Sequence, residues 1–208
     1  MNNMKFYGLR VYDMCESIVA SGLPMRKTEY TPEEFEKEVF GLSDCLDEFG
    51  IQIFEDAKLP KEVREQLFNK DYQKVLNHIR RACNLGNATP SSGHDCALKG
   101  IAVHVNIKAD QSFWLQFERY HFQDTISSMS TMHCLCKFEK LSEMFSPYTD
   151  PRSIAICNEY IEQYNNDPTP ENFQKVIHNC PEGIELTRRI ETNYLQLKTM
   201  FSQRKAHK

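Results

Sequence analysis

Residues 101–121, IAVHVNIKADQSFWLQFERYH, place a strand pattern directly before a helix pattern. Apolar side chains occupy every second position at the start, which is the period of a strand with one buried face: Ile101, Val103, Val105 and Ile107. Asp110 is then suited to cap a helix. That helix would carry three aromatic rings on one side: Phe113, Phe117 and Tyr120. A core strand followed at once by an amphipathic helix is therefore predicted.

Helix start signals precede this stretch. Residues 31–34, Thr-Pro-Glu-Glu, form a capping box with proline at the first helical position, and apolar residues follow at helical spacing as far as Gly50. Pro60 begins a shorter helix, and Asp71 is predicted to cap another that ends near Gly86. We therefore expect residues 1–86 to be largely helical, after a strand in KFYGLRVYD.

The segment 86–100, GNATPSSGHDCALKG, is rich in turn-forming residues and predicts a surface loop before the core strand, helix and loop of residues 101–140. Asp150-Pro151 and Thr169-Pro170 each signal a helix start. A last helix is expected from about Ile184, so that helices occupy residues 150–205. The prediction is an α+β fold, mostly helical with a small central sheet, in a single domain over residues 1–208.

Composition restricts the partners of the protein. A chain of 208 residues has the usual size of one domain. Its formal charge of -4 argues against binding nucleic acid in bulk. It has no run of about 18 apolar residues, as a membrane helix needs, and its N-terminus lacks the apolar core of a signal peptide. We expect a cytoplasmic protein without membrane contact.

The eight cysteines are scattered along the chain, which favours reduced thiols over a disulfide framework. Cys134 and Cys136 lie close together beside His133. No second Cys/His pair follows at the spacing of zinc ligands, so no metal site is predicted.

Residues 116–133, QFERYHFQDTISSMSTMH, combine many hydrogen-bonding side chains. Gln116 and Arg119 are three apart and face the same way on a helix, while Tyr120 and His121 close it. The arginine fork suits phosphate or carboxylate, and the glutamine amide can bind a base edge. Hydroxyl groups that can bind phosphate oxygens follow: Ser127, Ser128 and Ser130.

These residues provide groups for binding rather than for catalysis. A surface arginine, loop serines and structural histidines are the alternative interpretation of the same pattern. The sequence has no glycine-rich phosphate loop, zinc-protease helix or nucleophile elbow.

The run IKADQSFWLQFERYHFQDTISSMSTMH, residues 107–133, resembles the signature region of the flavin-dependent thymidylate synthases, the ThyX family. That region has a helix with Gln-Trp-x-Arg-His-Arg and then a loop with Asn-Glu-x-Ser-x-Arg-Tyr. Gln116 and Arg119 fall on the family's glutamine and first arginine, and Ser130 on its phosphate-binding serine. The resemblance also places His94 where the family has a histidine that contacts flavin.

A second stretch, CPEGIELTRRIETNYLQLKTMFSQR at residues 180–204, is similar to the family's C-terminal motif. Asn193 matches its asparagine and Arg204 its final arginine. The resemblance implies a mixed α/β fold, a homotetramer with sites between subunits, FAD, a pyrimidine deoxynucleotide and folate.

The departures from the family pattern argue against a standard thymidylate synthase. The family's acidic residue is missing, Met132 replaces its substrate-clamping arginine, and Tyr120-His121 replaces His-Arg. The sequence therefore predicts a ThyX-like protein that binds a nucleotide, or a molecule derived from one, in an intersubunit pocket. A flavin-dependent methyltransferase, transferring a one-carbon unit to a pyrimidine deoxynucleotide, and an oligomeric structural protein are the alternatives.

Overall fold

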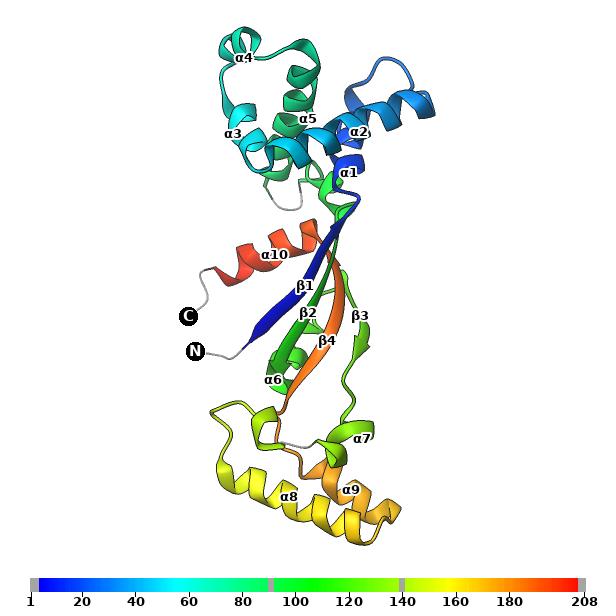
Figure 1. Cartoon of the computed structure of the whole chain (residues 1–208), viewed down its shortest axis with the longest axis vertical. Coiled ribbons are helices and arrows are strands. Elements are labelled where there is room, and N and C mark those ends of the chain that lie inside the picture. Colours follow the sequence, from blue (N-terminus) through cyan, green and yellow to red (C-terminus); the bar gives the residue numbers. More distant parts are fainter. Residues whose placement is uncertain (1–3, 90–91, 139–140, 206–208) are drawn as a thin grey trace. The chain divides into compact units, whose positions relative to one another are not determined.

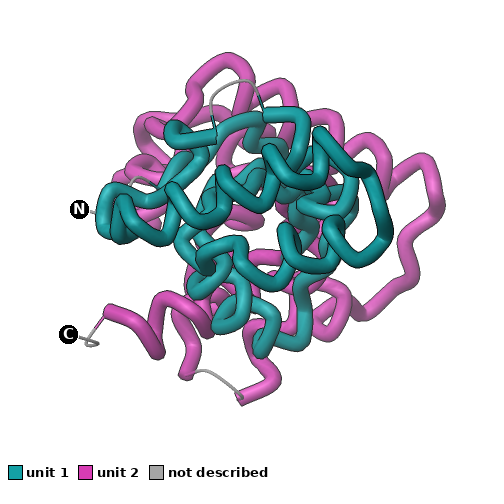
Figure 2. Tube along the Cα trace, turned by 90° about the horizontal axis from the view of Figure 1, so that it is seen from below, with its two compact units in different colours: residues 1–10, 104–192 teal, residues 11–103, 193–208 magenta. Residues whose placement is uncertain are grey.

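The computed structural model describes residues 4–89, 92–138 and 141–205, which form two compact units (Figure 2). Unit 1 contains the N-terminal residues as far as Arg10 and the segment His104–Thr192. Unit 2 contains Val11–Val103 and the residues from Asn193 onward. Parts of the predicted segments 1–86, 86–100 and 101–140 lie outside the described residues. A single domain over residues 1–208 stays a prediction.

The described residues contain a sheet of four strands (Figure 1), whose order is β1-β2-β4-β3. The strands are β1 Lys5–Tyr12, β2 Ala102–Asp110, β3 Gln123–Ser128 and β4 Glu185–Asn193. The strands expected near the N-terminus and after Gly100 are confirmed. With helices over most of the remaining described residues, the α+β fold class is also confirmed.

The expected last helix from Ile184 is wrong over its first half. Residues 185–193 form β4, and only Tyr194–Arg204 form a helix, α10. Leu186 and Ile190, four apart, suit either a helix or a strand. In the fold they are buried on one face of β4 by packing against the cores of unit 1, and pairing with β2 and β3 makes this segment a strand.

Trp114 is the centre of one of two cores of unit 1 that the described residues form. It lies in α6, Gln111–Phe117, and is 0% exposed. Its indole Nε1 donates to the carbonyl oxygens of Ala109 at 3.1 Å and Leu186 at 3.4 Å. The predicted cap is confirmed, since Asp110 accepts from the backbone N–H of Phe113 at 2.9 Å. The indole thus ties the helix to two strands.

The predicted helix carried Tyr120, but α6 ends at Phe117. Helix-like turns continue beyond it, because the N–H of Arg119 donates to the carbonyl of Gln116 and that of Tyr120 to the carbonyl of Phe117. The side-chain spacing of a helix is therefore kept as far as Tyr120.

A second core of unit 1 surrounds Cys157 and Val176, both 0% exposed. The predicted caps are confirmed: Asp150 accepts from the N–H of Arg152 at 2.9 Å, and Thr169 from that of Asn172 at 3.2 Å. The surrounding elements are α7 Thr131–Cys134, η3 Leu135–Lys137, η4 Leu141–Met144, α8 Pro151–Asn166 and α9 Pro170–His178.

Unit 2 is a helical assembly around a core that includes Leu42, Ile53 and Leu76. The predicted capping box at Thr31 is present. The predicted cap at Asp71 is wrong: Asn69 accepts from the N–H of Tyr72 at 2.9 Å, which moves the helix start two residues earlier. Besides α10, the elements are α1 Met14–Ala20, η1 Leu23–Met25, α2 Pro32–Phe49, α3 Gln52–Lys58, α4 Lys61–Leu67, α5 Lys70–Gly86 and η2 Cys96–Lys99.

All eight cysteines are free thiols. Within residues 4–89, 92–138 and 141–205, no group of three His, Cys, Asp or Glu side chains is placed to hold a metal ion. No helix in this part of the chain has the length and apolar character needed to cross a membrane.

Candidate functional site

Gln116 and Arg119 lie at the end of α6, and both side chains are exposed. Gln116 occupies the last turn, and Arg119 follows in the helix-like extension, so both project to the same side. Arg119 forms no ion pair with any residue that the structure describes. Its guanidinium fork is therefore open to an anionic ligand.

The next two candidate residues differ in exposure. Tyr120 is half-buried, with its ring centroid 6.2 Å from that of Phe117. His121 is exposed. The Tyr120 ring therefore extends the aromatic contacts of Phe117, while His121 faces solvent.

The three candidate serines do not share one face. Ser128 lies opposite Arg188 in the antiparallel β3–β4 pair, and Ser127 lies opposite Arg189. Because successive strand residues point to opposite faces, Ser128 shares the Trp114 side with Arg188, and Ser127 lies on the other side. Ser130 is half-buried at the N-cap position of α7 and makes no side-chain capping bond there.

Arg188 is a charged residue beside this site that the sequence patterns did not indicate. Its guanidinium carbon lies 4.5 Å from the centre of the Trp114 ring, a cation–π geometry. One guanidinium nitrogen donates to the carboxylate of Glu118 at 2.5 Å, and the arginine side chain is 15% exposed. Strand alternation from Leu186 to Ile190 would have placed Arg188 on the core side, had the segment been recognised as a strand.

The other three candidate residues belong to unit 2. Asn193 caps α10, since its side chain accepts from the N–H of Gln196 at 2.9 Å, and its amide NH₂ keeps its donor capacity. Arg204 is exposed in the last turn of α10. His94 is exposed beside Asp95, whose buried carboxylate pairs with Lys198 at 2.6 Å. Seven candidate residues thus lie in unit 1 and three in unit 2.

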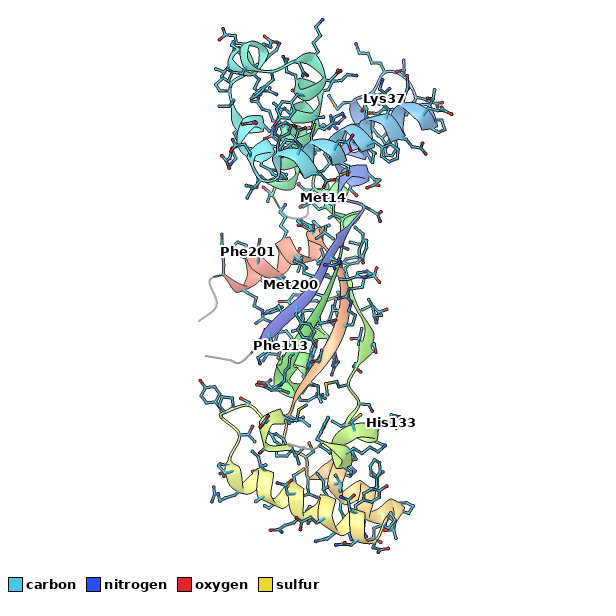
Figure 3. All side chains as sticks on the ribbon, in the orientation of Figure 1. Met14, Lys37, Phe113, His133, Met200 and Phe201 are labelled. Atoms are coloured by element: carbon cyan, nitrogen blue, oxygen red, sulfur yellow. The ribbon has the colours of Figure 1, made fainter. Side chains whose placement is uncertain are left out.

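Unit 2 also contains a cleft of about 1080 Å³, lined mainly by helices α2 and α5, which the sequence did not indicate. Lys37, labelled on α2 in Figure 3, lies on its wall beside aromatic and acidic side chains. Its acidic side chains are Glu34, Glu38, Asp44, Glu48, Asp56 and Asp71.

A hydrogen-bonded chain of polar side chains joins one wall of this cleft to α1. The Tyr30 hydroxyl donates to Glu38 at 2.5 Å, and Glu38 lies 3.1 Å from Nε2 of His78. Arg81 donates to Nδ1 of His78 at 2.8 Å and to the carbonyl of Ile18. Burial and the Arg81 charge lower the pKa of His78, against the opposite influence of Glu38. Because arginine can only donate, the contact between Arg81 and Nδ1 requires a His78 ring that accepts there, and such a ring carries its proton on Nε2, facing Glu38.

Comparisons with known proteins found solved structures with a similar fold. No protein-family model matches the chain, and no curated protein matches it in sequence. A structure of thymidylate synthase X from Helicobacter pylori with FAD and dUMP matches 100% of this chain and 86% of its own, with a TM-score of 0.52 at 12% identity. A second structure of that enzyme, also with FAD and dUMP, matches 75% of this chain and 81% of its own, with a TM-score of 0.50 at 13% identity. The chain therefore has a ThyX-like fold.

Proposed function

We propose that this chain binds a pyrimidine nucleotide, or a molecule derived from one, in a pocket completed by another copy of the chain. One observation supports this most directly. Gln116 at the end of α6 and Arg119 just beyond it are exposed on the same side, and Arg119 has no ion pair among the described residues, in a chain whose fold is similar to that of enzymes solved with FAD and dUMP.

The proposed contacts follow from the chemistry of the side chains. Arg119 provides a fork of N–H donors for phosphate, Gln116 can bind a base edge, and the hydroxyls of Ser128 and Ser130 can donate to phosphate oxygens. Asn193 and Arg204 are further proposed contacts through their N–H groups, with His94, Tyr120, His121 and Ser127 as the remaining candidates.

Met132 is the main reason to propose a binding protein rather than a standard thymidylate synthase. It is 49% exposed and stands where the resemblance expects an arginine. A hydrogen bond to a charged group is worth about 1.5–3 kcal/mol, so the loss of a bidentate arginine weakens phosphate binding substantially.

Self-association is proposed from the surface of β1. All eight residues of this edge strand are exposed, and Phe6, Tyr7 and Leu9 are 62%, 51% and 57% exposed. Edge strands with apolar side chains are suited to pair with another chain. The proposed assembly is a homotetramer, and the proposed location is the cytoplasm.

FAD is the cofactor of the alternative function, a flavin-dependent methyltransferase. Arg119, Tyr120 and His121 would hold it, and when bound it would supply the redox chemistry. The fit is partial: the guanidinium of Arg119 suits the flavin phosphates, but Tyr120 already packs towards Phe117 and His121 faces solvent. For this reason nucleotide binding is the leading proposal, and the third alternative is an oligomeric structural protein.

The first experiment is an absorbance spectrum of the purified protein from about 300 to 500 nm, with mass spectrometry of the small molecules released on denaturation. A released nucleotide without flavin absorbance supports the binding protein, and a flavin spectrum supports the enzyme. Release of neither, together with no binding of dUMP in calorimetry, would leave the structural alternative.

Replacement of Arg119 by alanine provides the residue-level test. We expect at least a tenfold loss of dUMP affinity, with the free energy of unfolding within about 0.5 kcal/mol of wild type, because the side chain is exposed and forms no ion pair with a described residue. Arg152→Ala is the matched control, since Arg152 is 88% exposed and pairs only locally with Asp150. Equal dUMP affinity in both variants would remove Arg119 from the proposed site.

A further inference from the structure

We infer that Arg188 is a phosphate-binding residue of the proposed nucleotide site, with Ser128 beside it, and that Glu118 occupies its guanidinium when no ligand is bound. This inference rests on the proposed function, because it specifies which group receives the phosphate. It assigns a cation to a site in which Met132 stands at the position of the expected arginine.

The guanidinium of Arg188 is held in place before any ligand arrives. It stacks over the ring of Trp114, and that ring is fixed by its own bonds to the carbonyls of Ala109 and Leu186. The arginine side chain is only 15% exposed, so little conformational freedom is left to lose on binding. Planar arginine forks that are stacked in this way are suited to bidentate binding of phosphate.

Ser128 places a hydroxyl next to this cation. Directly opposite residues of an antiparallel pair have Cβ atoms about 4.5–5.5 Å apart, so the two side chains can reach the same phosphate group. Ser128 is exposed, and its hydroxyl has no hydrogen-bond partner among the described residues. A donor and a cation therefore lie side by side on the face that carries Trp114.

Glu118 is the group that a phosphate would displace. Its carboxylate accepts from Arg188, but its side chain is 49% exposed and lies just beyond the end of α6. Glu118 is the more exposed partner of the pair, so its carboxylate can turn into solvent when a phosphate takes its place beside the guanidinium. A phosphate dianion carries more charge than the carboxylate and competes well for the fork.

Arg189, the next residue, has a different role. Its guanidinium donates to the carbonyl of Gly8 at 2.6 Å and to Asn106 at 3.3 Å, on the opposite face of the sheet. Gly8 has a positive φ of 63°, and a Cβ there would lie 3.3 Å from the guanidinium, so the backbone is shaped around this contact. Arg189 therefore joins strands and is not proposed to bind a ligand.

The test compares affinities of the full chain for dUMP, deoxyuridine and inorganic phosphate by calorimetry. Arg188→Ala should lower the affinity for dUMP and for phosphate by at least tenfold and leave the affinity for deoxyuridine unchanged, because only the phosphate contact is lost. Glu118→Gln should raise the affinity for dUMP and for phosphate several-fold, because the competing carboxylate is gone. Arg152→Ala and Glu171→Gln, which change matching charges on exposed surface, should leave all three affinities unchanged.

The outcomes separate this inference from the proposed function. If the wild-type protein binds neither dUMP nor deoxyuridine, both fail. If it binds dUMP but Glu118→Gln and Arg188→Lys leave that affinity unchanged, nucleotide binding stands and the role of Arg188 is refuted. The Glu118 variant keeps the test decisive even if Arg188→Ala does not fold, because a purely structural ion pair predicts no gain in affinity from the loss of Glu118.

Discussion

Replacement of Trp114 should destabilise the protein more than almost any other single change in unit 1. The side chain is 0% exposed, donates to two carbonyls and packs edge-on against Phe113 and Phe117, with ring centroids 5.1 and 5.8 Å away. Replacing a buried ring of this size by alanine lowers the free energy of unfolding by about 3–5 kcal/mol. Trp114→Phe keeps most of the volume but loses the indole N–H, worth about 0.5–1.5 kcal/mol, so it should cost less.

Urea unfolding, followed by far-UV circular dichroism, measures whether Trp114→Ala lowers the free energy of unfolding more than Trp114→Phe does. Fluorescence is unsuitable, because Trp114 is the single tryptophan of the chain. Phe122→Ala is the control, since Phe122 is 61% exposed and should change the free energy of unfolding by about 0.5 kcal/mol or less. A loss for Trp114→Ala no larger than that for the control would refute the argument that this ring organises the core.

Three further predictions concern unit 2. Asn193→Ala should cost about 1 kcal/mol in thermal unfolding, because it removes the cap of α10, and an unchanged melting temperature would contradict that role. Lys198→Met should cost about 3–5 kcal/mol in chemical unfolding, because it leaves the buried Asp95 carboxylate unpaired, whereas adding Asp95→Asn should restore part of the loss. Because the pKa of His78 is lowered in the folded state, the unfolded chain binds more protons as the pH falls, so the free energy of unfolding should decrease below about pH 6.5. His78→Gln should reduce this pH dependence in denaturant titrations, and an identical profile would show that other groups cause it.

The sequence predicted those features of the fold that depend on neighbouring residues. Caps at Thr31, Asp110 and Asp150 involve side chains that bond to backbone groups two or three residues away, so local sequence is sufficient to find them. The strand β4 was missed because its residues fit two periods. Pairing with β2 and β3 selects the strand, and those partners are remote in the chain.

The candidate site likewise has features that local sequence predicts and features that depend on remote segments. Gln116 and Arg119 could be paired from helical spacing alone. The separation of Ser127 from Ser128, and the position of Ser128 beside Arg188, depend on the register of two strands about 60 residues apart in the chain. The side chains that line the cleft of unit 2 come from helices α2, α3, α4 and α5 and from the segments that join them, and no sequence pattern brings these helices together.

The strand order β1-β2-β4-β3 has a consequence for how the chain is made. The strand synthesised last, β4, lies between β2 and β3, so β3 has no partner in the sheet until residues 185–193 leave the ribosome. Such long-range pairing is slow, and until it forms the apolar residues around Trp114 stay accessible to chaperones or to other chains. Since each unit is built from two separate segments, neither can be expressed as one continuous fragment. Messages truncated before residue 185 should therefore yield aggregation-prone products rather than a smaller folded protein.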